Sequence, residues 1–296
     1  MLFGSFWKKS KVNRLIIIVT FLWILLAIIF GVYDLSISKF LFNADDSAGK
    51  LVQAFGEVPG LLFMVFSLFV LNINAKIRNK NYKKLFFIFE ILLSSFLLTY
   101  ILRLFFNYFE VYFAFRSLEG VSVFLGFSLI SLLGFYLFKT KLSRFSEKNY
   151  LFSKLNVILF AVSGIIVEAL KLLWGRVRFA DLNAGLLNFT SWYSPNFSLG
   201  GSSFPSGHAY LAWILIPLFL VFSVKKKALK WAAIVLTTLF SLFVSYERIV
   251  IGAHYASDVL FSAGIVLLTF FILYKKNFDK KKNLSTGKFK KRKNRG

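Results

Sequence analysis

Residues 15–33 read Leu-Ile-Ile-Ile-Val-Thr-Phe-Leu-Trp-Ile-Leu-Leu-Ala-Ile-Ile-Phe-Gly-Val-Tyr, an apolar run without a charged side chain. A helix of this length spans the hydrocarbon core of a bilayer. Four basic residues and no acid precede it in residues 1–14. A cleaved signal peptide is the competing interpretation, but Gly31 to Asp34 is a poor substitute for the small residues of a cleavage site. The stretch therefore predicts an uncleaved membrane anchor.

The rest of the chain repeats this pattern. Hydrophobic residues make up 57% of the 296 residues, aromatic residues 19%, and the mean hydropathy is +0.68, which excludes an ordinary soluble domain. Seven more apolar runs follow the first, at 60–75, 85–102, 121–138, 155–173, 208–224, 229–246 and 257–274. The sequence therefore predicts an all-α integral membrane protein, a polytopic bundle of about eight transmembrane helices.

Basic residues divide unequally between the two sides that eight spans define. The chain has 37 Lys and Arg against 13 Asp and Glu, a net charge of +24. Of the 37, 29 fall on the side of both termini, in residues 1–14, 76–84, 139–154, 225–230 and 275–296. The positive-inside rule then predicts cytoplasmic termini in a plasma membrane, which is the inner membrane of a bacterium.

Two segments outside the spans have simple interpretations. The basic tail 275–296 could bind nucleic acid, but beside a membrane it more simply fixes topology and contacts anionic headgroups. We therefore expect a cytoplasmic tail and no nucleic-acid partner. Residues 34–59 are mixed and acidic, and we expect an outer loop or an interfacial helix there.

Composition excludes several kinds of chemistry. The chain has no cysteine, which removes disulfides, thiolate catalysis and cysteine-ligated metals. It has only two histidines, His208 and His254, and few clustered acids, so a zinc or di-iron site is poorly supplied with ligands. We expect chemistry that uses neither a metal nor another cofactor.

Glu90 and Glu168 lie within predicted spans, and an acid at such depth is a functional candidate by default. Each also has a structural explanation. Glu168 lies three residues before Lys171, so the two side chains share one helix face and can neutralise one another. We expect this pairing for Glu168.

Half of the eight basic residues on the outer side gather near the histidines: Lys171, Arg176, Arg178 and Arg248. Arginine offers a planar fork of donors for phosphate oxygens, and lysine adds a point charge. Residues 203–208, Ser-Phe-Pro-Ser-Gly-His, open the sixth predicted span. A helix that starts there directs free N–H groups outward, and Ser206 adds a hydroxyl, so the cluster predicts a phosphate site.

His254 and Asp258 are four residues apart, so they share one face of a helical turn. The carboxylate would keep a proton on one imidazole nitrogen and leave the other nitrogen free as a nucleophile or base. A second histidine can then protonate the leaving group, and we expect this role for His208.

Three segments resemble the signatures of the type-2 phosphatidic acid phosphatase superfamily. They are Lys171-x6-Arg178, Pro205-Ser206-Gly207-His208 and Arg248-x5-His254-x3-Asp258. The resemblance covers roughly residues 155–274 and uses both histidines. It implies a metal-independent, helical membrane phosphatase with a six-helix core.

The resemblance also implies a role for each matched residue. His254 would be the nucleophile that forms a phosphohistidine, Asp258 would orient it, and His208 would be the general acid. The phosphate would be bound by Lys171, Arg178, Ser206, Gly207 and Arg248. No metal and no cofactor is implied.

Two positions depart from the family pattern. Phe179 stands where proline is usual, and Glu247 stands where serine is usual. An acid at position 247 would repel phosphate unless it points away or pairs with Arg176. Because the family core commonly has six spans, we divide the chain into an N-terminal membrane region with an added pair of spans, a catalytic core and a basic tail, at residues 1–154, 155–274 and 275–296.

These features predict a membrane lipid phosphatase that hydrolyses a lipid phosphate monoester or diphosphate at the outer membrane face. Phosphatidate, phosphatidylglycerophosphate, undecaprenyl diphosphate and lipid A are candidate substrates. A lipid phosphotransferase of the same superfamily would instead pass the phosphoryl group from His254 to another acceptor. A channel, a transporter or a non-catalytic lipid-binding protein is the rival of another class, but a transporter needs polar residues at the bilayer midplane, whereas this cluster lies at one face.

Overall fold

The computed structural model describes residues 9–74, 79–109, 118–139, 143–197, 200–222 and 226–293. Every regular element within these residues is helical, and seven candidate spans are long and apolar enough to cross a membrane. In a bilayer the backbone finds no water to bond with, and an apolar helix satisfies its N–H and C=O groups within one segment. The predicted all-α polytopic membrane fold is confirmed.

The elements are, in chain order, α1 (Lys9–Leu41), α2 (Ser47–Phe55), α3 (Val58–Ile73), α4 (Lys80–Tyr108), α5 (Leu118–Phe138), α6 (Ser143–Trp174), η1 (Phe179–Asp181), α7 (Gly207–Trp213), η2 (Ile216–Val221), α8 (Lys227–Val250) and α9 (Ala256–Lys293). The elements η1 and η2 are short 3-10 helices. Helices α2 and α3 together form one of the seven candidate spans.

The sixth apolar run is a broken element rather than the single span expected at 208–224. Helix α7 ends at Trp213, and the chain continues as the 3-10 helix η2, with Pro217 in its first turn. Proline has no N–H to donate along an α-helix, and its ring clashes with the preceding turn. Within the described residues, seven long spans and one shorter apolar segment therefore replace the eight full spans expected.

The first helix is longer than the apolar run that predicts it. Helix α1 continues to Leu41, so Asp34 is a buried helical side chain and not the start of a loop. Helix α2 follows after a short turn, and the Asp46 carboxylate caps it by accepting the Gly49 N–H at 2.6 Å. The connecting segment expected from residue 34 therefore begins at residue 42.

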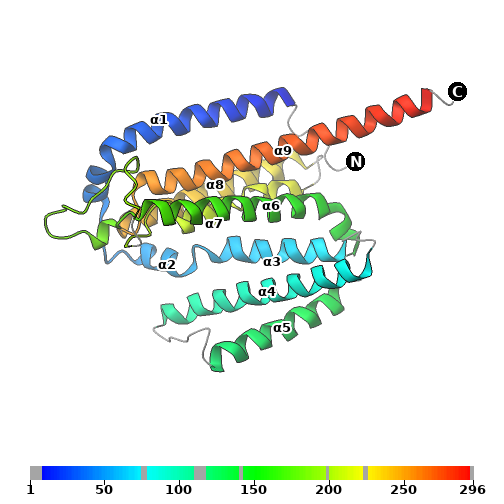
Figure 1. The fold of residues 1–296 in the computed structure, drawn as a ribbon, viewed down its shortest axis with the longest axis horizontal. Coiled ribbons are helices and arrows are strands. Elements are labelled where there is room, and N and C mark those ends of the chain that lie inside the picture. The colour runs from blue at the N-terminus through cyan, green and yellow to red at the C-terminus, as the bar shows by residue number, and fades with distance from the viewer. Residues whose placement is uncertain are drawn as a thin grey trace.

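The helices lie roughly side by side, with α1 and α5 at opposite edges of the molecule (Figure 1). Helix α1 packs on α9, α9 packs on α6 and α7, α6 packs on α3, and α3 packs on α4. The buried core is formed mainly by α3, α6, α7 and α9. The loop after α6 lies at the left of Figure 1, together with the starts of α7 and α9; we call this the site end.

Polar side chains join neighbouring helices inside the bundle. Asn156 of α6 donates to the Ser67 hydroxyl of α3 at 2.9 Å, and Asn72 of α3 donates to the Glu90 carboxylate of α4 at 2.8 Å. Such bonds help to hold helices together where lipid tails weaken the hydrophobic drive for association. Glu90, also bonded by Ser94 at 3.3 Å, thus has a structural partner on α3.

Gly60 lets α3 approach α7 closely. A Cβ atom at this position would stand 2.2 Å from the backbone oxygen of Leu211, which is too close for any side chain. The two helices therefore touch near the site end. As a result, Glu57, which precedes α3, lies beside His208 in the first turn of α7.

Candidate active site

The loop between α6 and α7 is tied by backbone hydrogen bonds to the segments around it. The Ser203 N–H donates to the Arg176 carbonyl at 3.0 Å, which closes the two ends of the loop on each other. The Ser206 N–H donates to the Asp258 carbonyl at 3.2 Å, which joins the start of α7 to α9. The segments that carry the three motifs therefore meet at the site end.

A tight turn between α8 and α9 carries His254. Gly252 in this turn has a φ of +68°, a conformation that favours glycine, and its carbonyl accepts the Ala180 N–H from the α6–α7 loop at 3.0 Å. The Arg248 carbonyl accepts the N–H groups of Ala253 and His254, each at 3.1 Å. The turn thus fixes Arg248 and His254 relative to each other.

The His254 ring is oriented by a backbone carbonyl. The residue is 3% exposed, and its Nδ1 lies 2.6 Å from the Ser203 carbonyl oxygen. A carbonyl only accepts, so Nδ1 carries the proton and Nε2 keeps a lone pair in the neutral ring. The Asp258 carboxylate, expected to make this contact, lies 3.8 Å from Nδ1, beyond hydrogen-bond distance. It instead accepts the Ser203 hydroxyl at 2.5 Å and the Tyr255 N–H at 2.9 Å. Asp258 therefore fixes Ser203, whose carbonyl contacts the His254 ring, and the residue that follows His254.

The His254 imidazole is neutral around pH 7. Burial lowers its pKa to about 4, and the positive charge of Arg248 lowers it further, whereas the Asp258 carboxylate partly opposes these effects. A neutral ring with its proton on Nδ1 presents the Nε2 lone pair, which is the form required for nucleophilic attack.

Arg176 stands at the centre of a buried ionic network. Its guanidinium donates to Asp258 at 2.5 Å and to Asp34 of α1 at 2.9 Å, and it lies 3.9 Å from the centroid of the Tyr255 ring. Asp34 also accepts the Ser257 N–H at 2.9 Å. Because two carboxylates match its charge, Arg176 secures Asp258 and is not available to a phosphate. The charge cluster in the sequence contained Arg176 but gave no sign of its partners.

Arg178 and Arg248, in contrast, have open donors. Arg248 is 3% exposed, and its Nε and Nη1 atoms have no hydrogen-bond partner among the described residues. The Arg178 Nε atom is also without a partner there, although Nη2 donates to Ser202 at 3.2 Å. The two guanidinium groups lie close enough for the charge of one to act on the other. Buried cationic donors without partners are costly, and an anion between them would remove that cost.

Lys171 reaches the same place from the last turn of α6. Its Nζ contacts the Glu168 carboxylate at 2.7 Å, which confirms the predicted pair, but Glu168 is 68% exposed and such a pair is weak. The Nζ atom would stand 3.3 Å from a Cβ built on Gly207. Gly207 therefore leaves the space through which Lys171 reaches the start of α7.

Ser206 is fully buried and caps α7. Its hydroxyl accepts the Ala209 N–H at 3.3 Å, as an N-cap residue does. Helix α7 has only seven residues, so its dipole is short. The positive potential at its N-terminus comes mainly from the charged side chains around it. The expectation that Ser206 also bonds phosphate remains a prediction.

Two acceptors that the motifs do not contain hold His208. Its Nδ1 lies 2.9 Å from Oε1 of Glu57, and its Nε2 lies 3.0 Å from the Gln53 carbonyl. Glu57 is buried before α3 and accepts the Tyr100 hydroxyl of α4 at 2.9 Å through its other oxygen. Helix α2, the start of α3 and helix α4 thus supply these contacts around His208.

Comparison with protein families agrees with this geometry. Residues 153–282 match the model of the PAP2 superfamily. This segment is similar to the PAP2 superfamily. No curated protein and no solved structure matches the chain. Members of the PAP2 superfamily are phosphoesterases, so the match supports phosphatase activity in general.

The PAP2 segment contains both histidines and all three motifs, whereas Asp34, Glu57 and Tyr100 precede it. The side chains that contact Arg176 and His208 therefore come partly from outside the segment that defines the family. The first four helices are part of the candidate site and not only a membrane anchor.

The two departures from the PAP2 pattern have clear surroundings. Phe179 opens η1 and packs edge-on against Phe42, with ring centroids 5.1 Å apart, so the loop rests on the residue that follows α1. Glu247 is buried beside Asp46, near the start of α2. It does not pair with Arg176, which is engaged by the carboxylates described above.

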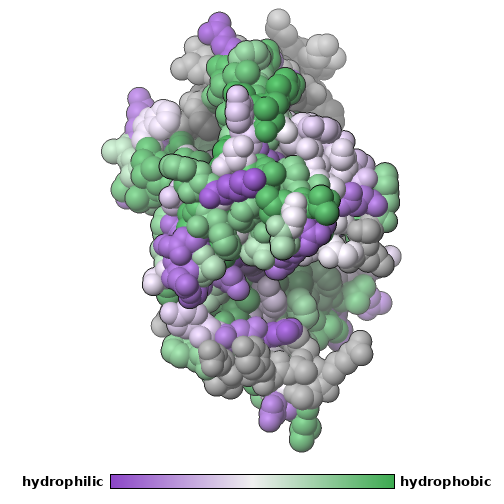
Figure 2. Space-filling view, turned by 90° about the vertical axis from the view of Figure 1, so that its left-hand side faces the viewer, coloured by the Kyte–Doolittle hydropathy of each residue, from purple (hydrophilic) through white to green (hydrophobic). Residues whose placement is uncertain are grey.

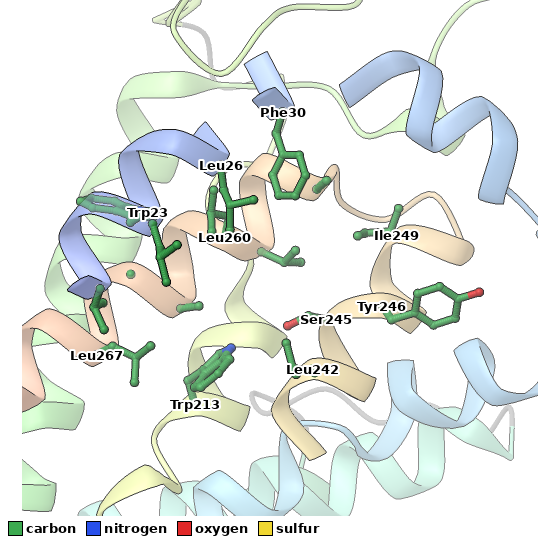
Figure 3. A pocket seen from close by; sticks show the side chains of 16 residues that line it. Trp23, Leu26, Phe30, Trp213, Leu242, Ser245, Tyr246, Ile249, Leu260 and Leu267 are labelled. Carbon is green, nitrogen blue, oxygen red and sulfur yellow. The ribbon is translucent and has the colours of Figure 1, made fainter. Parts of the chain in front are cut away.

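The site end presents charged and apolar side chains together (Figure 2). An apolar pocket of about 410 Å³ lies between α1, α7, α8 and α9. Trp23, Leu26 and Phe30 of α1 line it next to residues of α9, and residues of α8 lie across from them (Figure 3). The pocket extends to Ile249 and Ala256, at the two ends of the turn that carries His254.

Proposed function

We propose that this protein is a membrane lipid phosphatase that hydrolyses a lipid phosphate monoester or diphosphate through a phosphohistidine on His254. The observation that carries the proposal is the placement of His254, whose Nδ1 is held by the Ser203 carbonyl, in the same turn as Arg248, whose Nε and Nη1 have no partner among the described residues. A phosphate held by those donors would meet the Nε2 lone pair.

In the first step, Nε2 of His254 attacks phosphorus, and the bond between phosphorus and the leaving oxygen breaks. The bonding electron pair goes to that oxygen, which takes a proton from His208. In the second step, water attacks the phosphohistidine and gives a proton to His208. The P–N bond breaks, its electron pair returns to Nε2, and inorganic phosphate leaves.

The remaining residues support these two steps. Lys171, Arg178 and Arg248 stabilise the charge on the phosphoryl oxygens, with Ser206 and Gly207 shaping the floor of the site. Asp258 is a positioning residue, because it holds Ser203 and Tyr255 around the ring and does not contact the reacting nitrogen.

The apolar pocket supports a lipid substrate. It is lined almost entirely by hydrocarbon and aromatic side chains, and it begins beside the turn that carries Arg248 and His254 (Figure 3). A substrate with its phosphate at the site end and its tail in the pocket buries apolar surface that a soluble phosphate ester lacks.

Filling this pocket is expected to weaken the use of long-chain substrates. Leu242 of α8 lines the pocket, so Leu242→Trp should lower kcat/KM for a long-chain lipid phosphate by about tenfold, the effect of roughly 1.4 kcal/mol of overpacking. Hydrolysis of a short-chain analogue should change little. Leu239→Trp is the matched control, because Leu239 is similarly exposed, one turn earlier on α8, and does not line the pocket. Equal losses in both variants, or on both substrates, would remove the pocket from substrate binding.

The protonation of His254 can be observed directly, because the chain has only two histidines. In ¹⁵N-histidine NMR spectra of detergent-solubilised protein, assigned with a His208→Gln variant, His254 should stay neutral with its proton on Nδ1 from pH 8 to about pH 5. The sign follows from its pKa of about 4, since the charged ring forms only as the pH falls toward that value. A titration midpoint near 6.5 would contradict this assignment.

The distribution of lysine supports a site on the outer membrane face. Lys80, Lys83, Lys84 and Lys139 surround one pocket at the end of the bundle opposite the site end, between α3, α4 and α5. Under the positive-inside rule that end faces the cytoplasm, and the site end faces outward.

Phosphate release by detergent-solubilised protein from phosphatidate, phosphatidylglycerophosphate, undecaprenyl diphosphate and lipid A tests the proposal. At least one lipid should be hydrolysed far faster than a soluble sugar phosphate. No release from any of them would overturn the proposed function. Transfer of the phosphoryl group to an added alcohol, in preference to water, would make the protein a phosphotransferase.

A further inference from the structure

We infer that Glu57, which precedes the PAP2 segment, is a positioning residue that holds His208 as the proton donor. The inference rests on the proposed function and assigns a part in it to the N-terminal spans. It is carried by a contact that none of the three motifs contains, the 2.9 Å approach of Glu57 Oε1 to His208 Nδ1.

The carboxylate of Glu57 is committed to this contact. Glu57 immediately precedes α3, and its side chain makes no hydrogen bond to the free N–H groups of the first turn. It is 7% exposed, with one oxygen toward His208 and the other accepting the Tyr100 hydroxyl at 2.9 Å. Burying a carboxylate costs free energy unless hydrogen-bond partners compensate, so the contacts to His208 and Tyr100 are needed to keep Glu57 buried.

Both ring nitrogens of His208 face acceptors. Nδ1 faces the Glu57 carboxylate, and Nε2 faces the Gln53 carbonyl at 3.0 Å. A neutral imidazole has one N–H, so with Glu57 ionised only the doubly protonated ring donates in both contacts. That ring is the form of His208 that a general acid requires before the first step.

The geometry also separates the two nitrogens by role. Nδ1–H stays with Glu57, while Nε2–H exchanges the Gln53 carbonyl for the leaving oxygen of a bound substrate. When the bond between phosphorus and that oxygen breaks, the Nε2 proton moves to the oxygen, and His208 becomes neutral beside the Glu57 carboxylate. Water returns the proton to Nε2 in the second step.

The charged and titratable groups around this pair come from several helices. They are Tyr100 of α4, Lys171 of α6, Arg248 of α8 and His254 of the α8–α9 turn. Two of the four are permanent cations at neutral pH and would favour a neutral His208 if they acted alone. The Glu57 carboxylate, which contacts Nδ1 directly, opposes them and favours the doubly protonated ring.

The first test compares leaving groups. Glu57→Gln keeps the size and a hydrogen-bonding oxygen but removes the charge, so kcat/KM for a lipid alcohol phosphate should fall by at least about tenfold. Hydrolysis of a nitrophenyl phosphate, whose leaving group needs no proton, should fall much less. Glu90→Gln is the matched control, because Glu90 is also a buried carboxyl of the N-terminal spans and has its own partners. It should leave the ratio of the two rates unchanged.

The second test uses the His208 ring signals in ¹⁵N-histidine spectra at pH 7. In the wild type these signals should be those of a doubly protonated ring, and the doubly protonated fraction should fall in Glu57→Gln. Tyr100→Phe keeps the Glu57 carboxylate but removes the hydrogen bond from the Tyr100 hydroxyl. This variant should therefore give a smaller change in the same direction, both in the spectra and in the ratio of rates. This variant keeps the inference testable if Glu57→Gln does not fold.

The outcomes separate the inference from the function on which it rests. A wild type that hydrolyses no lipid phosphate refutes the proposed function. An active wild type and a folded Glu57→Gln with an unchanged ratio of rates and unchanged His208 signals refute the role of Glu57 alone. Equal losses on both leaving groups would make Glu57 a structural or phosphate-site residue and would also overturn the inference.

Discussion

Replacement of His254 by alanine is expected to abolish phosphate release from every lipid phosphate while the protein stays folded. The variant removes the only atom proposed to bond covalently to phosphorus, so the loss in kcat should be at least about 10⁴-fold. Single-turnover kinetics in detergent, with acid-labile phosphoprotein measured at each time point, would detect the loss of both the product and the intermediate.

The control for this variant must account for the hydrogen bond from Nδ1 to the Ser203 carbonyl. His254→Ala leaves that buried carbonyl without its donor, which costs about 1–3 kcal/mol of stability. His254→Asn supplies a side-chain N–H in roughly the same place and should restore thermal stability without restoring turnover. Near wild-type release by either purified variant would show that His254 is not the nucleophile.

The sequence was a good guide to the helices because their signal is local. The described residues of the apolar runs lie mainly in helices, and four lysines line one pocket at the end opposite the site end. The sixth run was the exception. Its hydropathy alone predicts a span, while Pro217 breaks the helix through the backbone, an effect that hydropathy does not measure.

Within the candidate site, the sequence predicted which side chains gather but not always what they touch. Lys171 and Glu168 pair as expected because three residues along one helix fix their spacing. His254 and Asp258 also lie on one face, yet the His254 ring bonds the Ser203 carbonyl, from a loop 51 residues earlier. A backbone acceptor leaves no signature in side-chain spacing.

Asp34 and Glu57 were missed for a related reason. Their partners, Arg176 and His208, lie more than 140 residues away in sequence. Only the packing of α1 on α9 and of α3 on α7 brings each pair together. A usable signal was present, since both are acids beside apolar runs on the predicted outer side, where uncompensated cations also gather. Charged residues are scarce on the predicted outer side, so pairing each acid there with a cation at the same membrane depth would have suggested these two contacts.

The roles of the two histidines can be separated with a substrate that carries an unusually good leaving group. If His208 protonates the departing oxygen, His208→Ala should lower the rate for a lipid alcohol phosphate by about 10²–10⁴-fold. For a nitrophenyl phosphate the same variant should lose far less, because nitrophenolate leaves without a proton. His254→Ala should be inactive on both substrates, since both need the nucleophile.

Single-turnover conditions are required for this comparison, because slow hydrolysis of the phosphohistidine would otherwise hide the first step. The structure adds a reason to expect a clean separation. Nδ1 of His254 faces one backbone carbonyl, whereas the two ring nitrogens of His208 face a carboxylate and a backbone carbonyl, so the two rings have different hydrogen-bond partners. Equal losses for His208→Ala on both substrates would assign His208 to phosphate binding. An exchange of the two phenotypes would mean that His208 attacks phosphorus and His254 supplies the proton, which a buried ring with a pKa of about 4 is poorly suited to do.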